Sequence, residues 1–388
     1  MSTHSAASAV AAKDWIGRYG NAVLDEPSSG VLAIGIGKKS TGPLDDDSRY
    51  CVTSFVERKL SRRELKARAI ADFGACFKTI CGARPAELDL ETDVVETGSP
   101  FSATPALRRD RSERGRYGGT PPPLDLQKRF EALRTGVGIT NPVGSYPQYL
   151  SVGTLGFFVS DAEGRVYLVS NNHVIANEND ARKGNAIVQP GTLDLTDTEL
   201  ELLDSLDRLR SELQIAKLSA WVTIEFTDGN TVPLNEVDCA IAEVLTHKRD
   251  LSDIARVGFG GVARGLGANY RIDPATGEFN ATTRVYKAGR TTGATEGDIV
   301  ALNVLSDVEY GAGVARFSNQ IAIRASRDNT GPFSDAGDSG SGIFDQEHKL
   351  VGLLFAGSET RTLANPVRPV LRKLATALGH GRLSLITH

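Results

Sequence analysis

From about residue 130 onward the chain consists largely of short runs of β-branched and aromatic residues separated by glycine-rich turns. The runs "VGTLGFFVS" and "RVYLVS" are joined by "DAEG", which places a glycine where a tight hairpin favours one. Similar runs follow at short intervals: "WVTIEF", "VDCAIAEV", "TTRVYKAG", "GDIVALNV", "NQIAIRA", "SGIF" and "LVGLLFAG". Many short strands at this spacing predict a sandwich or a barrel.

Two segments within this region carry a helical repeat instead. The segment "DTELELLDSLDRLRSEL" places charged residues opposite an apolar stripe made of Leu200, Leu203, Leu206, Leu209 and Leu213. We expect one helix here, with its leucine face buried either on its own domain or on a second copy of the chain, which makes a homo-oligomer a prediction. The segment "PVLRKLATALG" predicts a C-terminal helix over about 369–378, with Pro369 in its first turn and Gly379 at its end.

The first hundred residues follow a different pattern. Runs rich in branched and aromatic residues predict three strands, at about 30–37, 50–57 and 88–98. Between the second and the third, Ser61 and Glu64 match a helix capping box, in which each side chain bonds the backbone N–H of the other residue. Together these elements predict a small α/β module at 1–98.

Residues 99–128 separate the two patterns. The stretch "SATPALRRDRSERGRYGGTPPPLDL" mixes Arg, Gly, Ser and Pro without apolar periodicity, which favours a flexible linker. Its arginines would also suit an acidic partner or a cleavage site, but a solvated linker is the simpler interpretation. We therefore divide the chain into an N-terminal module (1–98), a linker (99–128) and a strand-rich domain (129–388).

The overall composition narrows the classes of function. The net charge of −4 over 388 residues does not direct the chain to nucleic acid or to an anionic membrane, and no apolar run reaches the ~18 residues of a membrane span. The four cysteines and six scattered histidines have neither metal-ligand spacing nor the density of a disulfide framework. The N-terminus lacks the basic start of a secretory signal. We expect a cytoplasmic protein with reduced thiols, no metal and no cofactor.

A cluster of glycines and serines near the C-terminal end contains a candidate nucleophile. In "GPFSDAGDSGSGIF" (331–344), Ser339 follows Asp338 between glycines, a composition that is also typical of an ordinary turn. A nucleophilic serine needs a base and an orienting acid. His173, after the run "YLVS", and Asp238, before the run "CAIAEV", suit those roles. Each also has a simpler interpretation: a hydrogen-bonded structural histidine, and a carboxylate paired in a helix cap or a salt bridge.

The order His173, Asp238, Ser339 is that of the chymotrypsin-like enzymes, and the surrounding segments resemble the trypsin-like (chymotrypsin-fold) serine protease family. "SNNHVIA" is similar to its base segment, "VDCAIA" to its acid segment, "GDSGSG" to its nucleophile loop, and "KAGRTTGATEGDIV" to a strand–turn–strand unit of bacterial members. The resemblance covers about residues 148–375. It is closest to bacterial relatives of the plant narrow-leaf trypsin-like proteins, which place a similar module before the protease domain.

This resemblance implies both a fold and a reaction. The fold is mainly β: two antiparallel β-barrels of chymotrypsin type at about 148–245 and 255–362, with a small N-terminal α/β module and an inserted helix. The reaction is peptide-bond cleavage by a serine endopeptidase, acting on a protein or peptide substrate through an acyl-enzyme. Ser339 is the implied nucleophile, His173 the base and Asp238 the acid that orients it.

The resemblance also assigns the residues around the nucleophile. The backbone N–H groups of Gly337 and Ser339 are the implied oxyanion hole, and the Asp338 carboxylate is expected to anchor that loop. Phe333 stands at the floor of the implied substrate pocket, and Ala356 and Gly357 stand on its wall. No acid occupies the floor position, although Asp335 is close to it in sequence.

Some features depart from the family pattern. The histidine segment lacks the adjacent cysteine of secreted trypsins, and Glu296 replaces a cysteine of secreted bacterial enzymes, which agrees with a reducing compartment. No Ile-Val-Gly-Gly-type start precedes the first barrel, so activation by a newly cut N-terminus is not expected. Two other functions stay open: a non-catalytic scaffold or binding protein on a protease fold, and an esterase that uses the same three residues.

Overall fold

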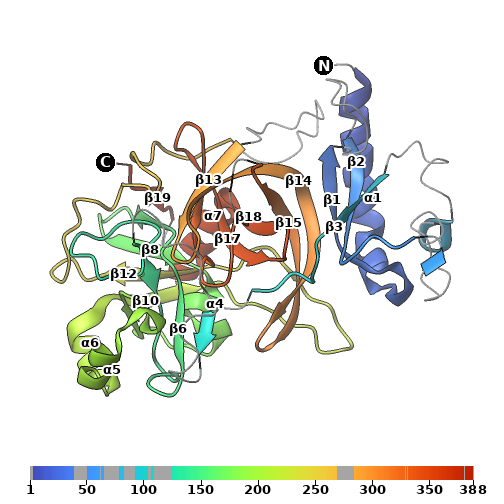
Figure 1. Cartoon of the computed structure of the whole chain (residues 1–388). Coiled ribbons are helices and arrows are strands. Elements are labelled where there is room, and N and C mark those ends of the chain that lie inside the picture. Colours follow the sequence, from blue (N-terminus) through green and yellow to red (C-terminus); the bar gives the residue numbers. More distant parts are fainter. Residues whose placement is uncertain are drawn as a thin grey trace.

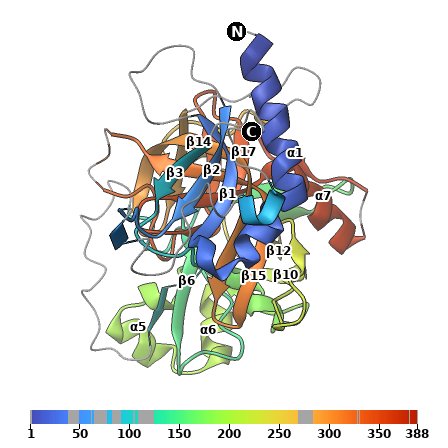
Figure 2. The same ribbon diagram turned by 90° about the vertical axis from the view of Figure 1, so that its right-hand side faces the viewer.

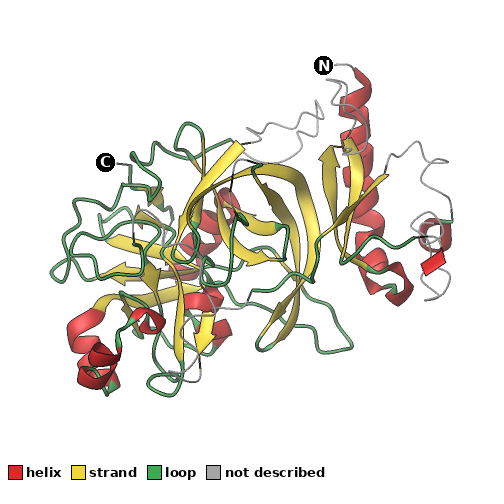
Figure 3. Cartoon of the chain, viewed as in Figure 1, coloured by secondary structure: helices red, strands yellow, loops and turns green. Residues whose placement is uncertain are grey.

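Figure 1 shows the architecture of the chain in a computed structural model. It describes residues 3–38, 50–61, 63–64, 78–82, 92–103, 106–108, 125–268, 284–327, 329, 331–379 and 381–387. The predicted fold class is confirmed: the protein is mainly β, with two barrels and a small α/β unit beside the second. Figure 3 shows strands filling the centre, with one long helix on one side and short helices on the opposite side.

Six antiparallel strands in the C-terminal half close into the second barrel. They are β13 (Arg284–Gly289), β14 (Gly293–Tyr310), β15 (Gly313–Ala325), β16 (Gly342–Asp345), β17 (Leu350–Gly357) and β18 (Thr362–Pro366). They pair in the cyclic order β13, β14, β15, β18, β17, β16 and back to β13, so each has a partner on both sides. The interior is filled by apolar side chains that include Val285, Ile299, Ile321, Ile343 and Leu354.

The first barrel is built from two connected sheets. One sheet orders β19 (Ser384–Leu385), β7 (Phe157–Ser160), β8 (Val166–Ser170), β12 (Ala240–Val244), β10 (Gln214–Trp221) and β9 (Ala186–Val188). The other orders β4 (Ala106–Arg108), β6 (Leu150–Thr154) and β5 (Gly138–Ile139). A bridge between Thr140 and Val188 joins them. Their shared core includes Leu133, Ile139, Phe158, Leu168, Ile187 and Ile215.

The two barrels pack against each other through a common apolar cluster. It combines side chains of both barrels, among them Phe157, Val169, Ile241, Phe344, Leu350 and Leu353. α7 (Val367–Leu378) buries Val370 and Leu374 in the same cluster and ends at Gly379, whose left-handed φ of 78° confirms the predicted stop. The remaining short elements lie in connections: η1 (Pro27–Ser29), α4 (Asn172–Ile175), η4 (Asn177–Asn179), η5 (Thr192–Asp194) and β11 (Leu234–Asn235).

The N-terminal unit extends the sheet of the second barrel. β1 (Val31–Lys38) pairs antiparallel with β14, β2 (Tyr50–Val56) pairs antiparallel with β1, and β3 (Thr92–Glu96) pairs parallel with β2, so the three predicted strands are confirmed. α1 (Thr3–Asp25) was not predicted; it lies along β1 and β2 (Figure 2) and buries Trp15, Ile16 and Val23 there. The strand β1 therefore has barrel strand β14 on one side and β2 on the other.

A buried arginine fastens α1 to the barrel. The side chain of Arg316, on β15, is 3% exposed and donates to Asp25 of α1 at 2.8 Å and to Asp307 of β14 at 2.7 Å. A guanidinium out of water needs such partners, because an unpaired buried charge is costly. The N-terminal unit is thus joined to the second barrel by both a continuous sheet and an ion pair.

Two local predictions in the N-terminal half can be compared with the structure. The capping box is confirmed: the Ser61 N–H donates to Glu64 at 2.9 Å and the Glu64 N–H donates to the Ser61 hydroxyl at 3.3 Å. Residues 65–77, which follow it, lie outside the described residues. Within the predicted linker, Phe101 and Ala103 are buried and belong to the packed body of the protein. The arginine-rich stretch lies largely outside the described residues, so the linker remains a prediction there.

The leucine stripe forms two helices instead of the single helix expected. α5 (Asp197–Leu202) stops at Leu203, and α6 (Leu206–Leu213) starts anew because the Ser205 hydroxyl caps it by accepting the Arg208 N–H at 3.4 Å. The five leucines nevertheless share one cluster with Tyr146, Val188 and Leu195 of the same chain. The stripe is therefore buried within its own domain and does not support the predicted homo-oligomer.

The predicted strand "WVTIEF" was wrong beyond its first residue, where β10 ends. Side-chain amides occupy the positions that a neighbouring strand would fill. Asn179 exchanges two hydrogen bonds with the backbone of Ile224, at 2.9 and 3.0 Å, and the Asn235 carbonyl accepts the N–H of Glu225 at 2.9 Å. The backbone polar groups are thus satisfied without a strand.

Other sequence expectations concern absent features. None of the helices in the described ranges combines the length and apolar character required to cross a bilayer. Cys51, Cys81 and Cys239 are free thiols, and Cys76 lies outside the described residues. Within the described ranges no three potential metal ligands gather.

Leu209→Ala should lower the free energy of unfolding by about 2–5 kcal/mol, because it opens a cavity in the fully buried centre of the α5–α6 cluster. Urea unfolding followed by circular dichroism measures the loss. Leu202→Ala is the control, since Leu202 is 63% exposed and its removal should leave stability unchanged. Equal effects of the two substitutions would contradict the packing described here.

Candidate active site

The pairing of β8 with β12 brings His173 and Asp238 to one place. The two strands are antiparallel, with Ser170 opposite Ala240. His173 follows β8 in the short helix α4, and Asp238 lies two residues before the start of β12. Because the end of one strand adjoins the beginning of the other, residues 65 apart in sequence become neighbours.

His173 and Asp238 form a buried hydrogen bond. His173 Nδ1 lies 2.5 Å from Asp238 Oδ2, and neither side chain is exposed. The second carboxylate oxygen, Oδ1, accepts the backbone N–H of Asn172 at 2.7 Å. A buried carboxylate requires such partners. Because a carboxylate accepts, the Nδ1 position carries the proton and Nε2 is left as the acceptor of the neutral ring.

Two residues that the sequence analysis missed complete the surroundings of Asp238. The Tyr310 hydroxyl, at the end of β14, donates to Asp238 Oδ2 at 3.0 Å, and its ring packs edge-to-face on the His173 imidazole at 5.8 Å between centroids. Burial, and then the charge of Asp238, raise the pKa of Tyr310 well above its ordinary value, so it stays a donor. Asn365 accepts the backbone N–H of Asp238 at 3.0 Å. Both come from the second barrel, and no motif near Asp238 pointed to them.

Ser339 lies in the loop between β15 and β16, and this loop is held by the first barrel. Thr154, the last residue of β6, donates its backbone N–H to the Ser339 carbonyl at 2.7 Å and its hydroxyl to the Gly337 carbonyl at 2.8 Å. On the other side, the Gly340 N–H donates to Leu354 of β17 at 2.9 Å. The loop is thus fixed between the two barrels.

The backbone of this loop leaves two amide groups unused. Gly337 has a φ of 95°, in the region that favours glycine. Among the described residues, neither the Gly337 N–H nor the Ser339 N–H has a hydrogen-bond acceptor. Two free backbone N–H groups placed two residues apart can both donate hydrogen bonds to a developing oxyanion and so stabilise it.

Within the described residues, the ring of His173 retains one unpartnered nitrogen, and the Ser339 loop lies on the other side of strand β6. His173 Nε2 is buried and, within the described part of the chain, has no hydrogen-bond partner. Ser339 is 6% exposed, and within the described residues its hydroxyl makes no hydrogen bond to His173. Gly153 of β6 lies between the two segments and leaves no room for a side chain. A Cβ on this residue would lie 2.5 Å from Val174 and 3.1 Å from the Ser339 carbonyl oxygen. Ser339 and the His173–Val174 turn therefore flank the same short stretch of β6.

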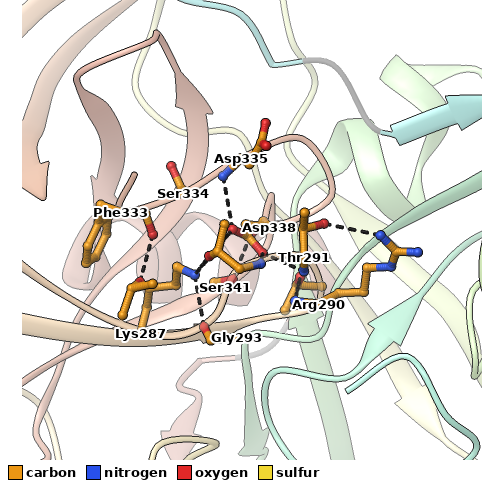
Figure 4. Close-up of polar contacts among 12 residues, drawn as sticks. Lys287, Arg290, Thr291, Gly293, Phe333, Ser334, Asp335, Asp338 and Ser341 are labelled. Carbon is orange, nitrogen blue, oxygen red and sulfur yellow. Dashed lines mark hydrogen bonds and ion pairs between the residues drawn. The ribbon is translucent and has the colours of Figure 1, made fainter. Parts of the chain in front are cut away.

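The Asp338 carboxylate is the centre of a dense polar network (Figure 4). Its Oδ1 accepts the N–H groups of Thr291 and Thr292 at 2.8 and 3.1 Å. Its Oδ2 accepts the Thr292 hydroxyl at 2.6 Å, the Asp335 N–H at 3.0 Å and the Lys287 ammonium at 3.2 Å. The expected anchoring role of Asp338 therefore has a geometric basis: Asp335 belongs to the same loop, and the other partners come from β13 and the turn after it.

Lys287 is the most unusual member of this network and was missed by the sequence analysis. Its side chain is fully buried, and its ammonium also donates to the Gly293 carbonyl at 3.0 Å and to the Thr292 hydroxyl. Burial lowers the pKa of Lys287, and the charge of Asp338 opposes that shift. The only hint in the sequence is a lysine within the apolar strand "RVYKAG".

The predicted pocket residues occupy different positions. Phe333 is buried and lines a cavity of about 260 Å³ together with Arg324, Ser334 and Arg361. Ala356 points into a separate apolar cluster and does not line this cavity. Gly357 lies next to the cavity, but its N–H and carbonyl already pair with Ser102 through two hydrogen bonds of 2.9 Å. The backbone N–H and carbonyl of Gly357 are thus occupied by hydrogen bonds to Ser102 of the same chain.

Comparison with known proteins adds the following. No protein-family model matches the chain, and no curated protein sequence does. Solved structures that are similar in shape include protease A of Thermobifida fusca (16% identity, TM-score 0.39), a Nocardiopsis protease (16%, 0.39) and a chymotrypsin of Cellulomonas bogoriensis (19%, 0.37). Each alignment covers 66% of this chain, and 100%, 98% and 100% of those chains in turn.

Lys287→Met should destabilise the protein by about 3–5 kcal/mol, because it removes the cation and leaves the Asp338 carboxylate buried without a countercharge. The free energy of unfolding in urea is the readout. Lys349→Met is the control, since the exposed Lys349–Glu347 pair should contribute nothing measurable. If the two variants were equally stable, the buried ion pair would not organise this loop.

Proposed function

We propose that the protein is a serine endopeptidase that cleaves peptide bonds through Ser339, His173 and Asp238. One observation carries the proposal: a buried imidazole is bonded to a carboxylate at 2.5 Å, its other nitrogen has no partner among the described residues, and its turn flanks the same stretch of β6 as Ser339. A structural histidine in the interior would be expected to satisfy both ring nitrogens. An unpaired Nε2 suits a group that must accept a proton during a reaction.

The proposed reaction is acyl transfer. Ser339 Oγ attacks the carbonyl carbon of the peptide while His173 Nε2 takes the hydroxyl proton, and Asp238 stabilises the imidazolium that forms. The N–H groups of Gly337 and Ser339 stabilise the oxyanion of the tetrahedral intermediate. The imidazolium then gives its proton to the leaving amine, and water hydrolyses the resulting ester with the same base.

In this proposal Lys287 activates the enzyme from within the uncut chain. The loop that would hold the oxyanion depends on a cation next to Asp338, and Lys287 supplies that charge from β13. A new N-terminus is therefore not required to complete the site. The suggested kinship with the plant narrow-leaf trypsin-like proteins and a cytoplasmic location remain part of the proposal.

An esterase with the same three residues is the second candidate, because the proposed chemistry is equally able to cleave an ester. A scaffold without activity is the third, and it would leave the unpartnered Nε2 without a role. Turnover of matched peptide and ester substrates by the same preparation separates the first two.

Ser339→Ala should abolish labelling by a fluorophosphonate probe and lower peptide cleavage to background, because it removes the attacking oxygen. Mass spectrometry of the labelled peptide locates the adduct. Ser211→Ala, on the exposed face of α6, is the matched serine control and should label like the wild type. Labelling that persisted in Ser339→Ala would refute the proposed nucleophile.

Tyr310→Phe should lower kcat by about tenfold, because the Asp238 carboxylate loses a hydrogen bond that fixes its position against the His173 imidazole. With one donor fewer, the Asp238 carboxylate attracts the imidazolium more strongly, so the acid limb of the pH–rate profile should move to higher pH. Tyr149→Phe, at a 41% exposed position, is the control. A lower thermal midpoint with an unchanged pH profile would reduce Tyr310 to a packing residue.

A further inference from the structure

The cavity beside the Ser339 loop has walls that suit a charged ligand. It measures about 260 Å³ and lies between Pro332–Ser334, which lead toward Ser339, and Ser358–Thr362, which join β17 to β18. The hydroxyls of Ser334 and Thr362 connect the two walls at 2.5 Å. The volume is below the roughly 300–1,000 Å³ of pockets for whole small molecules, so it suits a single side chain.

Arg361 lines this cavity without a countercharge. Its Nη1 donates to the carbonyl of Thr360 at 2.8 Å, whereas its Nε is buried and has no partner in the part of the chain that the structure describes. Within the described residues, no carboxylate lies within 4.0 Å of its guanidinium. Burial, and then the charge of Arg324, lower the pKa of Arg361 to about 10. This lower pKa reflects the free-energy cost of burying the charged guanidinium near a second cation.

Arg324 is a second cation in the wall and is only weakly compensated. Among the described residues its one ion-pair partner is Asp298, which lies 3.6 Å from Nη2 and already accepts Arg284 at 3.0 Å. The Nε of Arg324 is buried and, within the described residues, has no partner. Two guanidinium groups therefore share one small cavity.

The nearby acidic residues that the structure describes do not neutralise this pair. Glu359 lines the cavity, but its side chain turns toward the N-terminal unit: a Cβ on Gly98 would lie 2.8 Å from its Cδ. Asp335 does not line the cavity; it is exposed and bonds the N–H of Ala336 at 2.7 Å. With respect to the described residues, the cavity thus retains unmatched positive charge and unused N–H donors.

We propose that this cavity binds the carboxylate of a substrate aspartate or glutamate, on the acyl side of the bond that is cut, through Arg361 with Arg324 as a second cation. The inference rests on the proposed endopeptidase function and specifies its substrate class. A planar guanidinium matches a carboxylate with two parallel hydrogen bonds, and a bound carboxylate would offset the cost of burying Arg361. A substrate lysine or arginine would add a third cation and be rejected.

The test compares hydrolysis of peptide amides that differ only at the residue preceding the cleaved bond: Glu, Asp, Gln, Leu, Phe or Arg. The amidated ends ensure that only the side chain supplies a carboxylate. The wild type should cleave the Glu or Asp peptide at least tenfold faster, in kcat/KM, than the Gln peptide. Arg361→Gln should lower the ratio of kcat/KM for the acidic peptide to kcat/KM for the Gln peptide by about 10- to 100-fold.

Arg372→Gln is the matched control, since Arg372 is 62% exposed on α7 and should keep the wild-type preference. If Arg361→Gln does not fold, as judged by its thermal midpoint, Arg324→Gln provides the same comparison. Cleavage without a preference for acidic residues, or a preference unchanged in both arginine variants, would overturn this inference while the endopeptidase proposal stood. Absence of both cleavage and fluorophosphonate labelling in the wild type would overturn both.

Discussion

An ammonium group buried against a carboxylate holds together the loop on which the proposed chemistry depends. Lys287 and Asp338 are both fully buried, and removing two charges from water is offset only when every remaining donor and acceptor is satisfied. Here Thr291, Thr292 and Asp335 supply those bonds, while Thr154 holds the same loop from the first barrel. The arrangement fixes the backbone of Gly337 and Ser339 before any substrate binds, which is what stabilisation of an oxyanion requires.

The sequence was sufficient for the features that depend on local patterns. Short runs of β-branched and aromatic residues predicted most strands of both barrels, and the pairing of β8 with β12 explains why His173 and Asp238 meet as expected. The sequence was insufficient where a residue contacts a partner that is distant along the chain. Tyr310 reaches Asp238 over 72 positions, Lys287 reaches Asp338 over 51, and neither stands in a motif with its partner. Amides replaced a strand partner at Ile224 for the same reason: side chains from distant segments satisfied the backbone.

The N-terminal unit contributes to the neighbourhood of the site. Its strands continue the sheet of the second barrel through β14, the strand that ends at Tyr310. Ser102, just beyond this unit, pairs with Gly357, and the Thr360 N–H donates to Thr97 at 3.2 Å, so the turn that carries Arg361 is braced from the N-terminal side. The position of the cavity wall therefore depends on residues that precede both barrels.

The most direct test of the account is a crystal structure of the uncut chain with a peptide boronate bound. We expect a covalent bond from boron to Ser339 Oγ, a boronate oxygen within hydrogen-bond distance of the Gly337 and Ser339 N–H groups, and Lys287 still paired with Asp338. An uncut chain in which Asp338 had turned to solvent and the loop had closed over Ser339 would contradict the claim that Lys287 completes the site.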